Sequence, residues 1–149
     1  MTSSDAETRG EFRPESWADA EARYGALAPT AQAVVRETAR AMSFDRDEYE
    51  TRVTADVVET ARQTLFAETL AVRVADRAAF DAWRASYAGE VRVAGSDAVD
   101  SVAWHVSPAA GRAVAATFQN EADAAVGTVR RMAFNRLYRD RLTGGEAAE

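Results

Sequence analysis

The fold is decided by the stretch from Leu70 to Phe118, which reads LAVRVADRAAFDAWRASYAGEVRVAGSDAVDSVAWHVSPAAGRAVAATF. In its first five residues, large apolar side chains alternate with Ala71 and Arg73, and this period of two is typical of a β-strand. Between Asp76 and Tyr87 the aromatic residues instead recur three and four positions apart, which predicts a helix. The stretch therefore begins as a strand followed by a helix.

The rest of the stretch predicts three more strands. Alternation returns at residues 91–93, 102–106 and 114–118. The segment from Pro108 to Gly111 separates the last two and has the composition of a hairpin loop. We expect one set of alternating residues to face the core: Leu70, Val72, Val74, Val91, Val93, Val102, Trp104, Val106, Val114, Ala116 and Phe118.

Helices flank this stretch on both sides. Apolar residues at helical spacing predict helices over residues 16–24, 30–42, 46–53, 54–66 and 120–142. The order of the elements predicts an α+β fold: amino-terminal helices, then strand–helix–strand–strand–strand–helix, with about four mostly antiparallel strands. We expect one domain at residues 14–142, between a flexible leader (1–13) and a frayed tail (143–149).

The composition excludes several classes of site. The chain has 149 residues, no cysteine and one histidine, His105. Disulfides, thiolate metal sites and sites that need several histidines are therefore impossible. No apolar run approaches the ~18 residues that a membrane span needs, and residues 1–13 lack the apolar centre of a signal peptide. We expect a cytoplasmic protein with no membrane contact, no metal and no cofactor.

The charged residues are unusual in kind. All 18 basic residues are arginine, and 24 carboxylates spread along the chain give a net charge of −6. In molar salt the Debye length is about 3 Å, so repulsion among surface carboxylates is weak there. We interpret the acidity as adaptation to high salt rather than as a means of attracting a basic partner.

One face of the predicted sheet is a candidate ligand site. If the apolar set faces the core, the opposite face carries Arg73, Arg92 and His105 among small residues. Two arginines and a histidine suit an anionic ligand, because the guanidinium group matches carboxylate and phosphate groups. This pattern favours a small-anion or nucleotide site, although solvated side chains on an outer sheet face would give the same pattern.

The closing helix is a second candidate surface. A helical wheel places Arg131, Phe134, Tyr138 and Arg141 opposite its main apolar stripe. Exposed aromatic rings flanked by arginines suit a protein partner or a nucleic acid. The alternative is that Phe134 and Tyr138 pack beneath the amino-terminal helices, which would make the helix a buried strut.

Other patterns carry little chemistry. The three helices between residues 30 and 66 have lengths that fit a winged-helix-like DNA reader, but residues 45–68 hold seven acids and three arginines, a balance that repels phosphate. Ser107 and Asp100 near His105 lack the glycine pattern of a nucleophile elbow. We therefore assign no catalytic residue, and the sequence favours a non-enzymatic protein.

Five groups of residues carry a resemblance to known proteins: Pro29 to Gln32 with Val34 to Arg36, Phe44 to Arg46 with Glu48, Tyr49 and Arg52 to Thr54, Asp56 to Ala61, Val102 to His105, and Ala115 to Gln119. In these residues the chain, from about residue 14 to 142, resembles small proteins of unknown function from halophilic archaea. The resemblance implies a single domain in a halophile cytoplasm and no assigned activity or site. We therefore predict a binding or regulatory module that acts through a protein partner or self-association, with small-anion binding and nucleic-acid binding as the alternatives.

Overall fold

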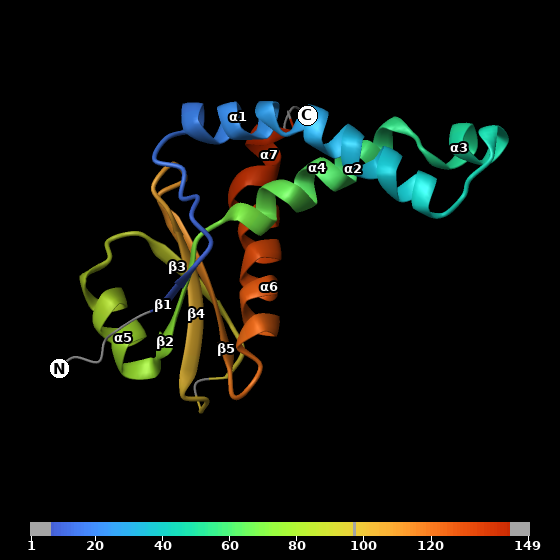
Figure 1. The fold of residues 1–149 in the computed structure, drawn as a ribbon. Coiled ribbons are helices and arrows are strands. Elements are labelled where there is room, and N and C mark those ends of the chain that lie inside the picture. The colour runs from blue at the N-terminus through green and yellow to red at the C-terminus, as the bar shows by residue number, and fades with distance from the viewer. Residues whose placement is uncertain (1–6, 97, 144–149) are drawn as a thin grey trace.

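The computed structural model describes residues 7–96 and 98–143 and contains a five-stranded sheet with helices on both faces (Figure 1). The elements in chain order are β1 (Glu7–Arg9), α1 (Trp17–Ala26), α2 (Ala28–Ala41), α3 (Arg46–Arg52), α4 (Ala55–Thr69), β2 (Val72–Asp76), α5 (Arg77–Ser86), β3 (Glu90–Ala94), β4 (Ser101–Ser107), β5 (Arg112–Phe118), α6 (Ala122–Ala133), the π-helical turn η1 (Phe134–Tyr138) and α7 (Arg139–Leu142). The predicted α+β class and the predicted order of helices and strands are confirmed.

The strands lie in the order β1-β2-β4-β5-β3. The β1–β2, β2–β4 and β4–β5 pairs are antiparallel, whereas β3 pairs with β5 in parallel at the edge of the sheet. Parallel pairing needs a crossover, and here the connection from β3 to β5 passes through β4, which lies on the other side of β5 in the sheet. The sheet is thus mostly antiparallel, as the sequence predicts.

Strand β1 is an element that the sequence did not predict. Residues 7–9 belong to the stretch for which we expected a flexible leader, yet Thr8 pairs with Arg73 on β2. Phe12 then forms a bridge with Leu70, so the chain follows the sheet for three more residues beyond the strand. The first six residues of the expected leader, and residues 144–149 of the expected tail, lie outside the described residues.

Both faces of the sheet are covered, which corrects the expectation of one outward face. One cluster packs Val72, Val114 and Ala116 beneath α6 together with aromatic residues from α1 and α4. The other packs Val102, Trp104 and Ala115 against Phe80 of α5. The apolar set that we expected on one face is therefore divided between the two, because the register places Trp104 opposite Arg73 rather than opposite Val72.

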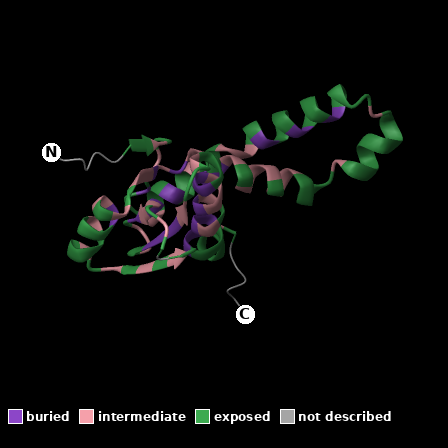
Figure 2. Ribbon diagram, turned by 90° about the horizontal axis from the view of Figure 1, so that it is seen from below, coloured by how far each residue is buried: buried purple, intermediate pink, exposed green. Residues whose placement is uncertain are grey.

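Three helices form an arm that projects from the body. In Figure 1, α2 and α4 lie side by side and α3 sits at the far tip. Most of this arm is exposed (Figure 2). Residues 36–65 contain a single buried residue, Ala39, and α3 has none. The predicted capping box of Asp45 and Glu48 is present and starts α3, so local hydrogen bonds rather than burial hold the tip in shape.

The closing helix lies along the sheet and changes its winding near its end. Residues 134–138 form one π turn, in which the N–H of Arg139 donates to the carbonyl oxygen of Phe134. Such a turn holds an extra residue and shifts the apolar stripe around the helix axis. Phe134, Leu137 and Tyr138 are all buried, together with Val129 and Ala133 of α6, and Tyr24 of α1 and Phe66 of α4 cover the two aromatic rings.

Candidate functional site

The structure does not bring Arg73, Arg92 and His105 together. Arg73 lies opposite Trp104 on the face that α5 covers. His105 lies opposite Val114, which in turn lies opposite Arg92, and this row belongs to the face that α6 covers. The anion site expected from these three residues is therefore divided by the thickness of the sheet.

His105 is a buried structural residue, only 1% exposed. Its Nδ1 lies 2.7 Å from the carbonyl oxygen of Ala71 and its Nε2 lies 2.8 Å from the Tyr138 hydroxyl oxygen. Since a carbonyl oxygen only accepts, Nδ1 carries the proton and Nε2 accepts from the tyrosine O–H. Burial lowers the pKa of His105 to about 4 and raises the pKa of Tyr138. The neutral imidazole thus joins β4, the chain before β2 and the closing helix.

The hydrolase arrangement around His105 has no support in the geometry. The Ser107 hydroxyl oxygen accepts from the N–H of Ala110, which closes the turn between β4 and β5. Ser107 is itself fully buried, and the imidazole nitrogens already have other partners. A nucleophile needs an exposed oxygen and a free base nitrogen, and this site offers neither.

The closing helix is a strut rather than an exposed aromatic surface. Phe134 and Tyr138 are buried against Phe66 of α4, with ring centroids 5.9 and 5.4 Å from it. Arg131 and Arg141 remain exposed. The stacking rings that would suit a nucleic acid are thus unavailable, although two arginines of the predicted set face solvent. The arm also differs from a winged-helix reader, because α3 buries no residue and does not act as a packed scaffold helix.

The arm carries an apolar groove of about 400 Å³ between α2, α3 and α4. Four exposed large hydrophobic side chains are identified in the described part of the chain, and all four lie on the arm. Three of them line the groove: Val34, Met42 and Val57, which are 43%, 58% and 42% exposed. The rest of the lining is also mainly apolar: Val35, Thr38, Ala39, Phe44, Arg52, Val53, Thr60 and Ala61.

The two ends of the arm differ in charge. Asp47, Glu50 and Asp56 near the tip are exposed and form no ion pair with another described residue. At the base, a second groove of about 290 Å³ between α4 and α6 contains Arg130, Arg131 and Arg139. Thr60 lines both grooves. One continuous surface along α4 therefore runs from an acidic tip, over an apolar centre, to a basic base.

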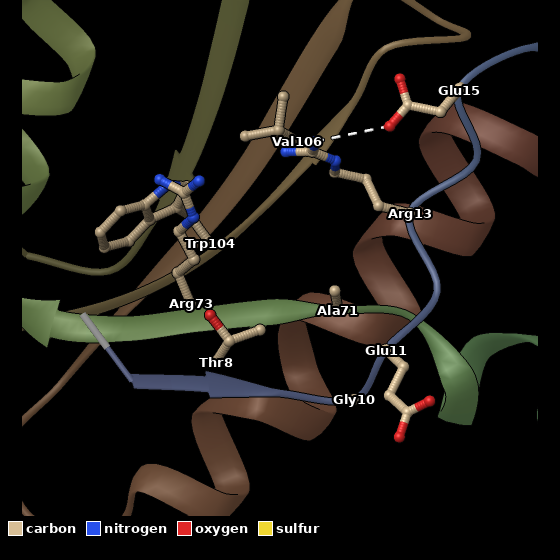
Figure 3. Close-up of a pocket in the computed structure, with 9 residues that line it drawn as sticks. All are labelled: Thr8, Gly10, Glu11, Arg13, Glu15, Ala71, Arg73, Trp104 and Val106. Carbon is tan, nitrogen blue, oxygen red and sulfur yellow. Dashed lines mark hydrogen bonds and ion pairs between the residues drawn. The ribbon is translucent and has the colours of Figure 1, made fainter.

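A third hollow of about 350 Å³ lies on the α5 side of the sheet, beside β1 and β2. Its lining, drawn in Figure 3, consists of Thr8, Gly10, Glu11, Arg13, Glu15, Ala71, Arg73, Trp104 and Val106. We call it the β1 cavity. It retains Arg73 of the predicted anion site but gives it different neighbours, because the unpredicted strand β1 and the chain after it form one wall.

Thr8, Arg13 and Trp104 line the β1 cavity and were not predicted as site residues from the sequence. Arg13 follows β1 and makes an ion pair with Glu15 at 3.5 Å. Trp104 is buried, and its indole N–H is the buried side-chain group without a hydrogen-bond partner among the described residues. The only feature of the sequence that marks Arg13 is its position just before Pro14. The alternation of apolar residues around Trp104 predicted a core residue and no role in binding.

A family model matches residues 11–139, which is most of the chain. The chain belongs to a family of unknown function, DUF5809. No curated protein and no solved structure matches it. The match to DUF5809 confirms that these residues form an uncharacterised domain. The matched residues include both grooves and most of the β1 cavity, and the family description assigns no activity to them.

The described residues of this DUF5809 chain were also compared with the requirements of a metal site and of a membrane-spanning helix. Within 7–96 and 98–143, no three histidine, aspartate or glutamate side chains gather closely enough to bind a metal ion. In the same ranges, every helix is too short or too polar to cross a membrane. The candidate sites are the surface along α4 and the β1 cavity, and both combine arginine side chains with apolar, hydroxyl and carboxylate side chains.

Proposed function

We propose that this domain is a non-enzymatic interaction module that binds a second copy of itself through its helical arm. The observation that carries the proposal is the placement of the exposed large hydrophobic side chains, which all lie on the arm. Monomeric domains tolerate scattered apolar side chains, but an apolar groove formed by three helices is typical of an interface. Two helical hairpins packed face to face form a four-helix bundle, which is a common solution for such surfaces.

The weak internal packing of the arm supports a covering partner. Fixing a helical residue costs about 1–2 kcal/mol of conformational free energy, which burial of apolar surface normally offsets. Residues 36–65 contain only one buried residue, so the arm offsets little of this cost on its own. Burial of the exposed parts of Val34, Met42 and Val57 would contribute about 1 kcal/mol each.

The charge pattern along α4 favours a second copy in a particular orientation. In a twofold arrangement whose axis is perpendicular to the arm, the tip of one arm lies against the base of the other. The acidic tip with Asp47, Glu50 and Asp56 would then face Arg131 and Arg139 of its partner. A tip-to-tip arrangement would instead oppose like charges, which is unfavourable.

The experiment is sedimentation of the full chain over about 1 to 100 μM, where a dimer held by about 8 kcal/mol dissociates. In a dimer, Met42→Glu places two negative charges in the apolar centre of the interface, one from each copy. Loss of its exposed apolar surface in both copies, about 2 kcal/mol, alone predicts dimerisation weaker by about 30-fold. The matched control is Ala33→Glu, which adds the same charge to an exposed position on the opposite side of α2 and should leave the dimer intact.

A pair of charge reversals tests the orientation. At low salt, Glu50→Arg and Arg131→Glu should each weaken the dimer, and the double variant should recover part of the loss. Stronger dimerisation of Glu50→Arg alone would indicate tip-to-tip contact. A chain that stays monomeric throughout the concentration range, or equal effects of Met42→Glu and Ala33→Glu, would refute self-association through the groove.

The proposal includes a cytoplasmic setting in a salt-rich cell such as that of a halophilic archaeon. Support comes from the composition: arginine as the only strongly basic residue type, no cysteine and a net charge of −6. High salt screens the carboxylates at the tip and strengthens apolar association when the salt is strongly hydrated. The dimer should therefore persist in molar salt through its apolar centre.

A further inference from the structure

The β1 cavity contains an aligned row of hydrogen-bond donors. Thr8 on β1 lies directly opposite Arg73 on β2, and Arg73 lies directly opposite Trp104 on β4. Residues directly opposite one another in a sheet project from the same face. Three side chains that carry a hydroxyl, a guanidinium and an indole thus stand side by side across three strands, and Figure 3 draws the Arg73 guanidinium beside the Trp104 ring.

The Trp104 indole N–H is the most informative member of this row. Tryptophan nitrogen donates only, and a buried donor without an acceptor costs about 1–3 kcal/mol. Trp104 is 1% exposed, and its Nε1 has no acceptor among the described residues. The group next to it, the Arg73 guanidinium, also donates only. Because Nε1 is covered from solvent, an acceptor from outside has to move a neighbouring side chain aside to reach it, and there it would satisfy both groups at once.

Arg13 adds a second positive charge from the opposite wall. Its guanidinium extends over the sheet toward Val106, and its recorded partner is Glu15 at 3.5 Å (Figure 3). That ion pair is exposed, and exposed pairs of this kind contribute about 0–1 kcal/mol. The Glu11 carboxylate is drawn away from Arg73. Within the described residues, Arg73 itself has no hydrogen-bonded or ion-paired side-chain partner, so its charge is available.

We propose that the β1 cavity binds a small oxyanion, a phosphate or carboxylate group of a small molecule, between Arg73, Trp104, Thr8 and Arg13. Guanidinium groups bind both kinds of oxyanion in a fork geometry, and the indole and hydroxyl donors fix the remaining oxygen atoms. A volume of about 350 Å³ admits a small molecule rather than a polymer. The site lies away from the arm and does not depend on the dimer.

The test titrates the full chain with inorganic phosphate and, separately, with succinate, at constant ionic strength set with chloride. The direct readout is the set of indole N–H signals in a nitrogen–proton correlation spectrum, since the chain has three tryptophans. The Trp104 signal, assigned as the one absent from Trp104→Phe, should shift on binding because its N–H gains an acceptor. Phosphate alone, succinate alone or both producing the shift would identify the preferred oxyanion.

Arginine variants locate the site. Arg73→Ala and Arg13→Ala should each weaken binding by about tenfold or more, the loss expected for one charge-assisted hydrogen bond. Arg92→Ala removes an exposed arginine from the other face of the sheet and should leave the affinity unchanged. Neither probe moving the Trp104 signal would overturn the proposal. Equal affinity in Arg73→Ala and the wild-type chain would overturn it too, as would an effect of Arg92→Ala equal to that of Arg73→Ala.

Discussion

The single histidine makes stability depend on pH by an amount that follows from the structure. Burial lowers the pKa of His105 from 6.5 to about 4 in the folded chain. Between these values the unfolded chain binds a proton that the folded chain does not, so stability present above pH 6.5 is lost as the pH falls toward 4. Between about pH 7.5 and about pH 5 the loss from this residue amounts to about 2 kcal/mol.

Urea unfolding of the wild-type chain and of His105→Gln at both pH values measures this loss. Carboxylates titrate in both chains, so only the difference between the two pH effects belongs to the histidine. We expect the wild-type chain to lose about 2 kcal/mol more than the variant. Equal losses would refute the buried neutral imidazole.

A titration by NMR checks the same point without a substitution. Because His105 is the only histidine, its imidazole signals are unambiguous in the folded chain. They should remain those of the neutral ring down to about pH 5, and a midpoint near 6.5 in the folded protein would contradict the burial argument.

Two further predictions concern stability. Tyr138→Phe removes the hydroxyl that donates to the buried imidazole and should lower the free energy of unfolding by about 1–3 kcal/mol. The control, Tyr49→Phe on the exposed arm, should change it little. Equal urea midpoints for the two variants would contradict the hydrogen bond between Tyr138 and His105. Gly10→Ala and Gly111→Ala should each lower the free energy of unfolding by about 1–2 kcal/mol, because both glycines have positive φ. Gly10→Ala should lower it further, because a Cβ there would lie 2.6 Å from the Leu70 carbonyl oxygen, whereas a Cβ at Gly111 meets no atom within 4 Å. Thermal unfolding of the two glycine variants compares them, and the reverse order would show that the β1 connection tolerates the change.

The elements that follow a clear hydrophobic period could be predicted from the sequence. Alternation located β2 to β5, and helical spacing located the helices on either side. Strand β1 was missed because Glu7, Thr8 and Arg9 contain no apolar residue. Their pairing depends on the neighbouring strand β2 rather than on their own composition.

The faces of the sheet could not be assigned by alternation alone. Ala103 and His105 alternate with Val102 and Trp104, and all four are buried, because helices cover both faces. A period of two separates inside from outside only when one face meets water. Because both faces of this sheet are covered, the residues of the predicted anion site were assigned to one face although they lie on two. The neighbours that Arg73 has on β1 could not be predicted, since that strand is far away in the sequence.

The helical wheel alone did not decide whether the aromatic residues of the closing helix are buried. A wheel assumes 3.6 residues per turn throughout, whereas residues 134–138 form a wider turn. Phe134 and Tyr138 pack against Phe66 of α4, so the buried alternative that the sequence offered is the one the structure has.

The π turn also gives the closing helix one place where family members can differ in length. It accommodates one residue more than an ordinary helical turn, so a return to regular winding can absorb the deletion of one residue between 134 and 138 and keep the residues after it on the same side of the helix. The hydrogen bond from the helix to the buried histidine can therefore survive such a deletion if the donating tyrosine is kept. Longer insertions and deletions should instead collect at the tip of the arm, where α3 has no buried contacts to disturb.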